Sequence, residues 1–155
     1  MPHIHEKIDY TAEVFVVYKN TVLLRKHDKY KMWMSVGGHI ELDEDPTQAA
    51  VREVKEEVGL DVKLADDLLP SVERTIRYRD LIPPKFLNRH RINETHEHVA
   101  FIYFATTDSD RITEGDVEVS AEMHWFTEED LNNPAWGIAE DITHYARQAL
   151  KELGK

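Results

Sequence analysis

The chain has 155 residues and a formal net charge of −11, with 19 Lys and Arg against 30 Asp and Glu. Hydrophobic residues make up 41% and Cys is absent, so we expect one folded domain over residues 1–155 and exclude disulfides, thiolate zinc sites and Cys nucleophiles. The net charge excludes bulk attraction to nucleic acid or an anionic membrane, although acidic side chains can hold a cation that binds phosphate.

The N-terminal ten residues are polar and lack the apolar segment of a signal peptide. The longest mainly apolar runs, Val14–Tyr18 and Val99–Ala105, are far shorter than the ~20 residues of a membrane helix. We therefore expect a cytoplasmic protein with no membrane association and no stable nucleic-acid binding.

The first predicted elements form a β-hairpin. Glu13–Tyr18 is rich in β-branched and aromatic residues, and Asn20 offers a turn before a second run at Val22–Arg25. A polar loop follows at His27–Met32. Gly37-Gly38 then breaks the pattern before a short acidic stretch.

The clearest helix follows this acidic stretch. Asp45 is a favourable N-cap, Pro46 suits the first helical position, and Gln48 completes a capping box. The helix should end near Val58, because Gly59 suits the position after a helix. At helical periodicity we expect its buried face to contain Val51, Val54 and Val58.

The rest of the chain mixes strands and helices. We expect a short strand at Asp61–Leu64, an irregular segment at Leu68–Arg91, and a strand buried on both faces at His98–Ala105. Another strand lies within Val117–Phe126, and Thr127 caps a short turn at Glu128–Leu131. A final amphipathic helix is predicted at Ile138–Leu153. This mixture indicates an α/β or α+β fold with helices packed on a mixed sheet.

Three carboxylates lie together on the first helix. Glu53, Glu56 and Glu57 have i, i+3 and i+4 spacing, so they share a face roughly opposite the valines. Oxygen-rich sites of this kind suit Mg²⁺ or Mn²⁺. On carboxylate count alone, a solvated acidic face with nothing bound is the favoured interpretation, because such faces are common.

The spacing of the whole segment favours a metal site. Gly38, Glu44 and the run Arg52–Leu60 fit the pattern G-x5-E-x7-R-E-U-x-E-E-x-G-U, where U is a bulky aliphatic residue. The segment resembles the Nudix box at every fixed position, and a chance match is about 10⁻⁶ or less per chain. The order of elements around it is also similar to that family. The resemblance implies the Nudix fold, an α/β/α sandwich around a mixed β-sheet, over nearly the whole chain.

By position, the resemblance implies a divalent-metal site made by Glu53, Glu56 and Glu57, with the carbonyl of Gly38 as a further ligand. Arg52 would orient the glutamates together with Glu44, which suits the bidentate geometry of guanidinium.

The resemblance to the Nudix box also implies structural roles for two glycines. Gly37, with its neighbour Gly38, would let the backbone approach the metal or a phosphate closely. Gly59 serves the end of the helix.

The family cleaves a diphosphate linked to another moiety, with Mg²⁺ as cofactor and Mn²⁺ as a possible substitute. By resemblance, water attacks phosphorus without a covalent nucleophile, and Glu53, Glu57 and Arg52 are the implied catalytic residues. The general base is either Glu53 or a residue of a later loop. Outside the box Glu118 is the first candidate, ahead of Glu122 and Glu97, and a plain surface charge is the alternative for Glu118.

The one basic block of the chain lies within Ser71–Glu94. Its arginines are candidates for binding substrate phosphates: Arg74, Arg77, Arg79, Arg89 and Arg91. A solvated loop and a dimer contact are the alternatives. The substrate expected from the box is a nucleoside diphosphate derivative or a (deoxy)nucleoside triphosphate, bound by a monomer or homodimer.

Histidines at the start of the strongest strand also suggest a metal site. His96 and His98, at i and i+2, share one face of the predicted strand. No third ligand is evident, so a position lining the substrate cleft, or ordinary polarity at a strand start, is the simpler interpretation. His39, directly after Gly38, is expected near the site without an assigned role.

Two functions outside catalysis compete with the hydrolase prediction. A Nudix-fold module could bind or sense a nucleotide without cleaving it, but the intact glutamates and Arg52 favour turnover. A calcium-binding acidic domain is disfavoured because the chain has no EF-hand loop pattern.

Overall fold

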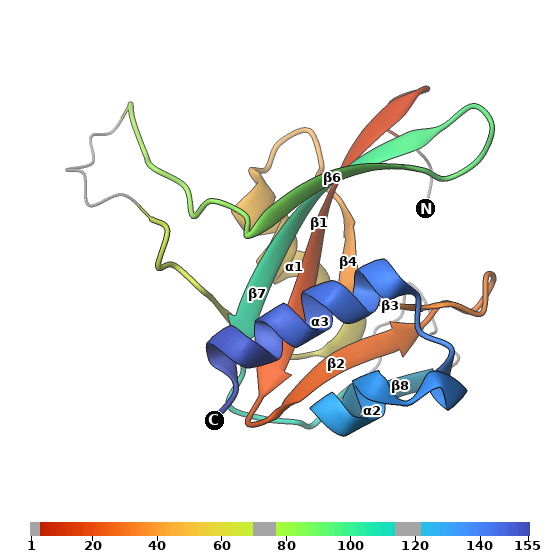
Figure 1. Cartoon of the computed structure of the whole chain (residues 1–155). Coiled ribbons are helices and arrows are strands. Elements are labelled where there is room, and N and C mark those ends of the chain that lie inside the picture. The colour runs from red at the N-terminus through yellow and green to blue at the C-terminus, as the bar shows by residue number, and fades with distance from the viewer. Residues whose placement is uncertain (1–3, 70–76, 114–121) are drawn as a thin grey trace.

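The computed structural model describes residues 4–69, 77–113 and 122–155. Within these residues eight strands form one sheet, in which β1 and β7 are central (Figure 1). The strands are β1 (Ile8–Tyr18), β2 (Thr21–Lys26), β3 (Trp33–Met34), β4 (Val36–His39), β5 (Lys63–Leu64), β6 (Phe86–Arg91), β7 (Glu97–Thr106) and β8 (Glu122–Phe126). The helices are α1 (Pro46–Val58), α2 (Glu128–Asn132) and α3 (Glu140–Leu153), with a 3₁₀ turn at Pro134–Trp136.

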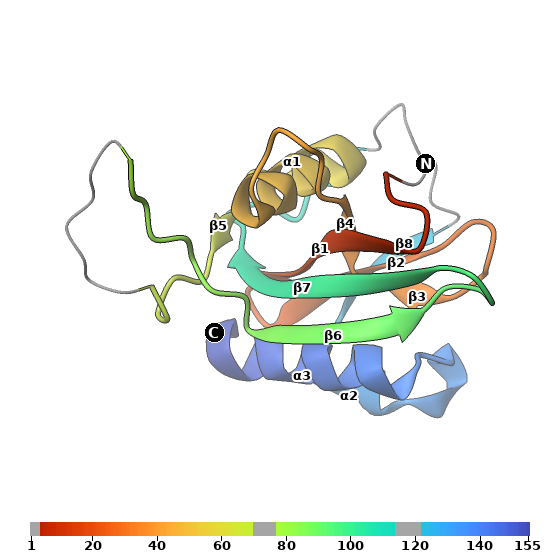
Figure 2. The ribbon, with the colours of Figure 1, turned by 90° about the horizontal axis from the view of Figure 1, so that it is seen from above.

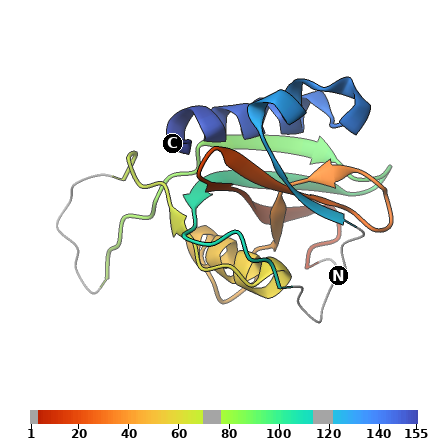
Figure 3. The ribbon, with the colours of Figure 1, turned by 90° about the horizontal axis from the view of Figure 1, so that it is seen from below.

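The elements form three layers. Helix α1 covers one face of the sheet, and α2 and α3 cover the other, as the views from above and below show (Figures 2 and 3). The sheet is mixed, because β1 and β7 run parallel while the other pairs are antiparallel. The predicted α/β class and the α/β/α sandwich around a mixed sheet are confirmed.

Strand β1 divides the core by its alternation. Ala12, Val14 and Val16 pack with Val54 and Val58 of α1. The side chains between them point to the opposite face, since successive residues of a strand alternate. There Phe15 and Val17 pack with Phe104 and with Ala146 and Ala149 of α3.

Helix α1 begins and ends as its sequence predicts. Asp45 and Gln48 form both bonds of a capping box, and Gly59 closes the helix with φ of +71°. The prediction that Val51 is buried is wrong, because its side chain is 41% exposed. The helix is rotated so that Glu53 and Glu57 lie inside with Val54 and Val58. Gly38 of β4 makes this rotation possible, since a carboxylate of α1 occupies the space that a Cβ would need.

Two other predictions need correction. Gly37-Gly38 is not a break between elements, because both residues belong to β4 and pair with Glu13 and Ala12 of β1. The segment expected to be irregular contains β6, which pairs along β7. Strand β6 has a mostly polar, exposed sequence, so its pairing depends on β7 rather than on its own hydrophobic pattern.

Residues 77–84, which lead into β6, run outward beyond the sheet (Figure 1). None of the helices in the described ranges is both long and apolar enough to cross a membrane.

Candidate active site

A cleft of about 600 Å³ opens beside the N-terminal half of β1. Strands β1 and β4, helix α1, the loop after β2 and the β6–β7 hairpin all contribute to its wall. The residues lining it are Thr11, Glu13, Arg25, His27, Asp28, Lys29, Tyr30, Met34, Gly37, Gly38, His39, Glu57, His90, Ile92, Asn93 and His98. Its size is that of a pocket for a small organic ligand.

Arg52 connects the acidic residues beside this cleft. Its Nε and Nη2 donate to Glu44, with the shortest contact 2.6 Å from Nη2 to Oε1. Its Nη1 donates to Glu53 at 2.9 Å and to Glu56 at 3.1 Å, and its Nη2 also donates to the carbonyl of His39 at 3.0 Å. The hydrogen bonds from Arg52 lower the pKa of Glu44 and hold three carboxylates in fixed directions.

Glu53 lies inside the protein because of Gly38. A Cβ on Gly38 would stand 2.5 Å from Glu53 Oε1, so no residue with a side chain fits there while Glu53 keeps its place. Burial raises the pKa of the Glu53 carboxyl, and the charge of Arg52 and hydrogen bonds with Arg52 and Glu57 offset part of that rise.

Glu57 forms a buried ion pair that the sequence did not reveal. Arg25 Nε of β2 lies 3.1 Å from Glu57 Oε2, and both side chains are less than 10% exposed. The same nitrogen lies 3.3 Å from the carbonyl oxygen of Ser35. Through this contact Arg25 sets the direction of the Glu57 carboxylate. Removing either side chain would leave the other as an uncompensated buried charge.

Glu13 is a second residue that the sequence did not reveal. It lies on the cleft wall, where its Oε2 accepts a hydrogen bond of 2.8 Å from Ser35 Oγ. Burial raises the pKa of Glu13 to about 7, and the Glu53 charge adds to the rise, while Ser35 and Arg25 act against it. Asp9, Thr11 and Glu13 alternate along β1 on one face, and this polar pattern before an apolar one was the available signal.

The structure brings together part of the predicted site. Glu53 and Glu57 are buried, whereas Glu56 is 46% exposed and points toward Arg52 at the surface. A Cβ on Gly37 would meet the carbonyl of Ala12 at 2.3 Å and Glu13 Oε2 at 2.6 Å, so the close approach there is to β1.

Three candidate bases were predicted outside the box, and the structure describes two of them. Glu118 falls outside the described residues. Glu122 is on β8, 3.8 Å from Lys26, and Glu97 pairs with Arg89 at 2.7 Å. Neither of these two lines the cleft.

The arginines of the basic block that the structure describes lie at the surface. Arg74 falls outside the described residues, and Arg77, Arg79, Arg89 and Arg91 are all exposed. None of these four lines the cleft, although His90, between two of them, does. The role of this block in phosphate binding stays a prediction.

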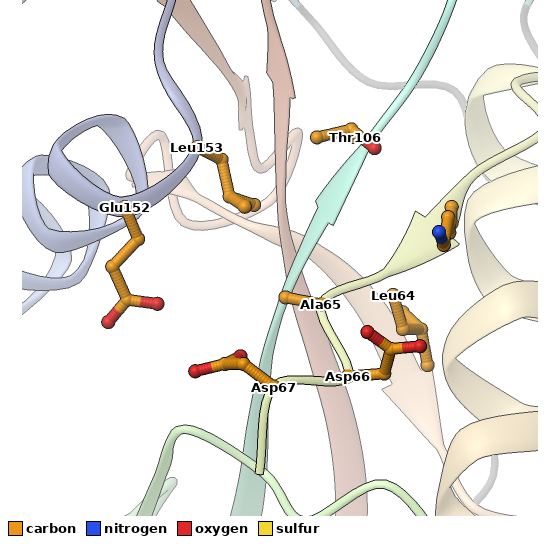
Figure 4. Close-up of a pocket in the computed structure, with 8 residues that line it drawn as sticks. Leu64, Ala65, Asp66, Asp67, Thr106, Glu152 and Leu153 are labelled. Atoms are coloured by element: carbon orange, nitrogen blue, oxygen red, sulfur yellow. The ribbon is translucent and has the colours of Figure 1, made fainter. Parts of the chain in front are cut away.

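A second hollow of about 440 Å³ lies between β5 and the end of α3 (Figure 4). Its acidic residues are open to solvent: the side chains of Asp67 and Glu152 are 65% and 37% exposed. Lys85 Nζ lies 2.5 Å from Asp67 Oδ1 and 2.9 Å from Glu152 Oε2. The Lys85 side chain is only 6% exposed, so the charge buried beside this hollow is a cation, whereas the cleft buries carboxylates.

The box carboxylates fit a divalent cation. Glu53 and Glu57, one helical turn apart on α1, are only 2% and 8% exposed, so two carboxyl groups of the box are shielded from solvent. Such a pair of hard oxygen donors is what Mg²⁺ prefers. Glu56 is turned outward, so in the described part of the chain the three carboxylates do not converge on one point.

Comparison with solved structures agrees with this fold. A hydrolase of the NUDIX family from Clostridium perfringens is 37% identical, with a TM-score of 0.79 over 94% of this chain and 97% of that one. A C. elegans Ap4A hydrolase, 16% identical with a TM-score of 0.68, shares the fold over 94% of this chain and 97% of that chain.

Curated relatives match a smaller part of the chain. The dihydroneopterin triphosphate diphosphatase of Escherichia coli is 40% identical over 60 residues, which span 39% of this chain and 40% of that protein. The Haemophilus influenzae protein of the same name is 32% identical over 103 residues, or 57% of this chain and 64% of that protein. The NUDIX domain family matches residues 9–148. With the box on α1, its carboxylates beside a cleft and the sandwich around it, the chain belongs to the Nudix family and is a Nudix hydrolase.

Proposed function

We propose that this enzyme hydrolyses the diphosphate bond of a nucleoside diphosphate derivative or a nucleoside triphosphate, with Mg²⁺ as its cofactor. The observation that carries the proposal is the buried pair Glu53 and Glu57. It is oriented by Arg52 on one side and Arg25 on the other, and it stands beside a cleft large enough for a nucleotide.

Glu53 and Glu57 would hold the metal, with Glu56 and the carbonyl of Gly38 as further ligands. Bound Mg²⁺ neutralises charge on the diphosphate oxygens and makes water more acidic. Mn²⁺ suits the same oxygen ligands and is the expected substitute.

The side chains of the chain itself supply position and proton transfer. Arg52 and Arg25 hold the carboxylates in fixed directions before substrate binds, so little reorganisation accompanies the reaction. We propose Glu53 as the general base that takes a proton from the attacking water. Its carboxylate is held in one direction by Arg52, whose Nη1 donates to it at 2.9 Å. Glu118 stays the alternative base.

The cleft rim offers a surface for an aromatic base. The rings of His27 and Tyr30 lie 4.8 Å apart, and Tyr30 is 54% exposed at the mouth of the cleft. An exposed aromatic ring provides area for stacking at low entropic cost. This feature favours a substrate with a flat heterocycle.

A second candidate substrate is dihydroneopterin triphosphate, which carries such a heterocycle. It is favoured by the names of the relatives from E. coli and H. influenzae. Those matches cover only part of each protein, so the pterin substrate ranks with nucleoside triphosphates rather than above them.

The test is a hydrolysis screen with Mg²⁺ over nucleoside triphosphates, dihydroneopterin triphosphate, ADP-ribose, sugar nucleotides and dinucleoside polyphosphates. We expect phosphate or pyrophosphate release that stops with EDTA, and ¹⁸O from labelled water in one phosphate product. Binding of a substrate without product release would instead support the sensing module. A folded protein that neither binds nor cleaves any of these compounds would overturn the proposal.

A further inference from the structure

Strand pairing brings an aspartate and two histidines together above the box. Asp9 of β1 lies opposite His98 of the parallel strand β7, and His39 ends β4, whose register places it opposite Thr11. Asp9 and His39 are 1% and 7% exposed. The sequence showed no further ligand beside His96 and His98. Strand pairing brings Asp9 and His39, which are distant from His98 along the chain, to its side.

The three donor groups have the spacing of a metal's ligand shell. Asp9 Oδ2 lies 3.5 Å from His39 Nε2, and His39 Nε2 lies 3.4 Å from His98 Nε2. One donor atom of each residue lies within 4.8 Å of the other two. For Zn–N bonds of ~2.0–2.1 Å, neighbouring corners of a tetrahedron are about 3.3–3.4 Å apart. The observed spacings exceed the usual ~2.7–3.2 Å of an N–H···O hydrogen bond.

A simple hydrogen-bonded Asp–His pair explains this geometry less well. His39 Nε2 faces both a carboxylate oxygen and a second imidazole nitrogen. A single N–H at that atom cannot point in a straight line at both partners, whereas one cation can contact all three atoms at once.

Surrounding groups hold these donors in place. The backbone N–H of His5 donates to Asp9 Oδ1 at 2.7 Å, and His96 Nε2 lies 3.3 Å from Asp9 Oδ2. Arg52 donates to the carbonyl of His39 at 3.0 Å. Metal ligands are commonly oriented by such outer contacts.

The structure assigns to Asp9, His39 and His98 a second metal site for a transition-metal ion of the Zn²⁺ class. Two imidazoles and one carboxylate suit such an ion and do not suit Mg²⁺, which prefers oxygen ligands. The buried carboxylate of Asp9 would oppose a phosphate group at the same point. His39 and His98 both line the cleft, so a fourth position is open to water or to a ligand there.

This inference does not depend on the proposed function. Its donors are separate from Glu53, Glu56 and Glu57, and its ligand chemistry differs. The experiment therefore measures metal binding directly and keeps Mg²⁺ in excess, so that the carboxylate site is occupied by Mg²⁺.

The first measurement uses the unmodified protein. One equivalent of Zn²⁺ is added in excess Mg²⁺, and long-range ¹H–¹⁵N NMR follows the ring nitrogens of the histidines. We expect the Nε2 signals of His39 and His98 to shift, while those of His144, on the outer face of α3, stay in place. Co²⁺ should give the strong visible absorption of a four-coordinate nitrogen and oxygen site. Unshifted His39 and His98 signals would overturn the assignment.

The second measurement uses variants. Asp9→Asn and His98→Gln should each weaken Zn²⁺ binding by at least about 10-fold. The matched control His144→Gln should bind Zn²⁺ as tightly as the unmodified protein does. Zn²⁺ should raise the melting temperature of His144→Gln but not that of His98→Gln. Equal Zn²⁺ affinity in all variants would overturn the assignment. If Asp9→Asn does not fold, His98→Gln and the NMR of the unmodified protein decide.

Discussion

The two hollows of the molecule hold acidic residues in opposite ways. In the cleft, Glu57 and Arg25 form an ion pair that is almost completely shielded from water, and Glu13 lies close by. In the hollow between β5 and α3, Asp67 and Glu152 are exposed and share one lysine, Lys85. Both hollows are lined by acidic residues, yet only the first buries its carboxylates, whereas in the second the buried group is the lysine.

The difference shows where folding free energy is given up for function. Burying a charge costs several kcal/mol before its partner compensates, and a buried pair seldom adds net stability. Exposed pairs cost little and contribute about 0–1 kcal/mol. Burying Glu53, Glu57 and Arg25 therefore gains the fold little stability. It is best explained by their proposed role in holding a metal beside the cleft. Substitutions in the cleft should therefore have large effects, and matched substitutions in the second hollow should have small ones.

The largest effect is expected for Glu57→Gln. The amide keeps the volume but loses the charge that is proposed to hold Mg²⁺, so we expect kcat to fall by more than the ~10–100-fold typical of an outer contact. Steady-state kinetics with Mg²⁺ measures this, and circular dichroism shows whether the fold is kept. The matched control is Glu152→Gln in the second hollow, which should retain activity. Unchanged turnover in Glu57→Gln would contradict the site assignment.

Arg25→Met should be the next most damaging change. It leaves Glu57 buried without its partner, which typically costs about 3–5 kcal/mol of unfolding free energy. We also expect kcat to fall by about 10–100-fold, because Arg25 pairs with Glu57, the proposed metal ligand.

Urea denaturation measures the stability of this variant. The neighbouring Lys26→Met is the control, since Lys26 lies 3.8 Å from the exposed Glu122 and its loss should cost about 1 kcal/mol or less. In a double-mutant cycle, Glu57→Gln should cost less in the Arg25→Met background. Additive effects would show that the pair does not act as a unit.

Glu13→Gln should change how stability depends on pH. The folded protein holds the Glu13 proton up to a pKa of about 7, above the ordinary value of 4.5. The stability that this proton provides is complete below the pKa of Glu13 in the unfolded chain. It is lost as the pH rises through the pKa of Glu13 in the folded protein. The stability of the glutamine variant relative to the unmodified protein should therefore rise between about pH 4.5 and about pH 7.

Thermal or urea unfolding across that pH range, in EDTA to keep metal away, measures the difference. Ser35→Ala is the companion variant, because it removes a hydrogen bond that acts against the high pKa of Glu13. A constant difference between Glu13→Gln and the unmodified protein would mean that Glu13 titrates normally.

These buried groups also mark the limit of what could be predicted from the sequence. The caps at Asp45 and Gly59 and the strand at β7 were predictable, because capping residues and a long apolar run act locally. The face that α1 buries was not, because it is set by Gly38 on another strand.

The partners of the site have the same origin. Arg25 reaches Glu57, and Asp9 and His39 reach His98, only through the register of β1, β2, β4 and β7. In the sequence Arg25 is the end of an apolar run, and Asp9 lies before the predicted start of its strand. Local patterns identify the box, whereas the partner of Glu57 and the separate Asp9, His39 and His98 group depend on tertiary pairing.

The smallest effect is expected for Asp67→Asn. Its carboxylate is 65% exposed, and hydrogen bonding from Lys85 lowers its pKa. The variant should lose at most about 1 kcal/mol, because the Asp67 carboxylate is itself solvated and Glu152 still pairs with the buried Lys85. The loss of stability should appear above the ordinary carboxyl pKa, where Asp67 is ionised. It should vanish in acid, because the Asp67 carboxyl is then protonated and the amide of the variant is neutral at every pH. Chemical denaturation at neutral and acidic pH, with kcat measured in parallel, makes the comparison. A clear fall in kcat would mean that the second hollow takes part in catalysis, and burial of charge would then no longer separate the functional site from the surface.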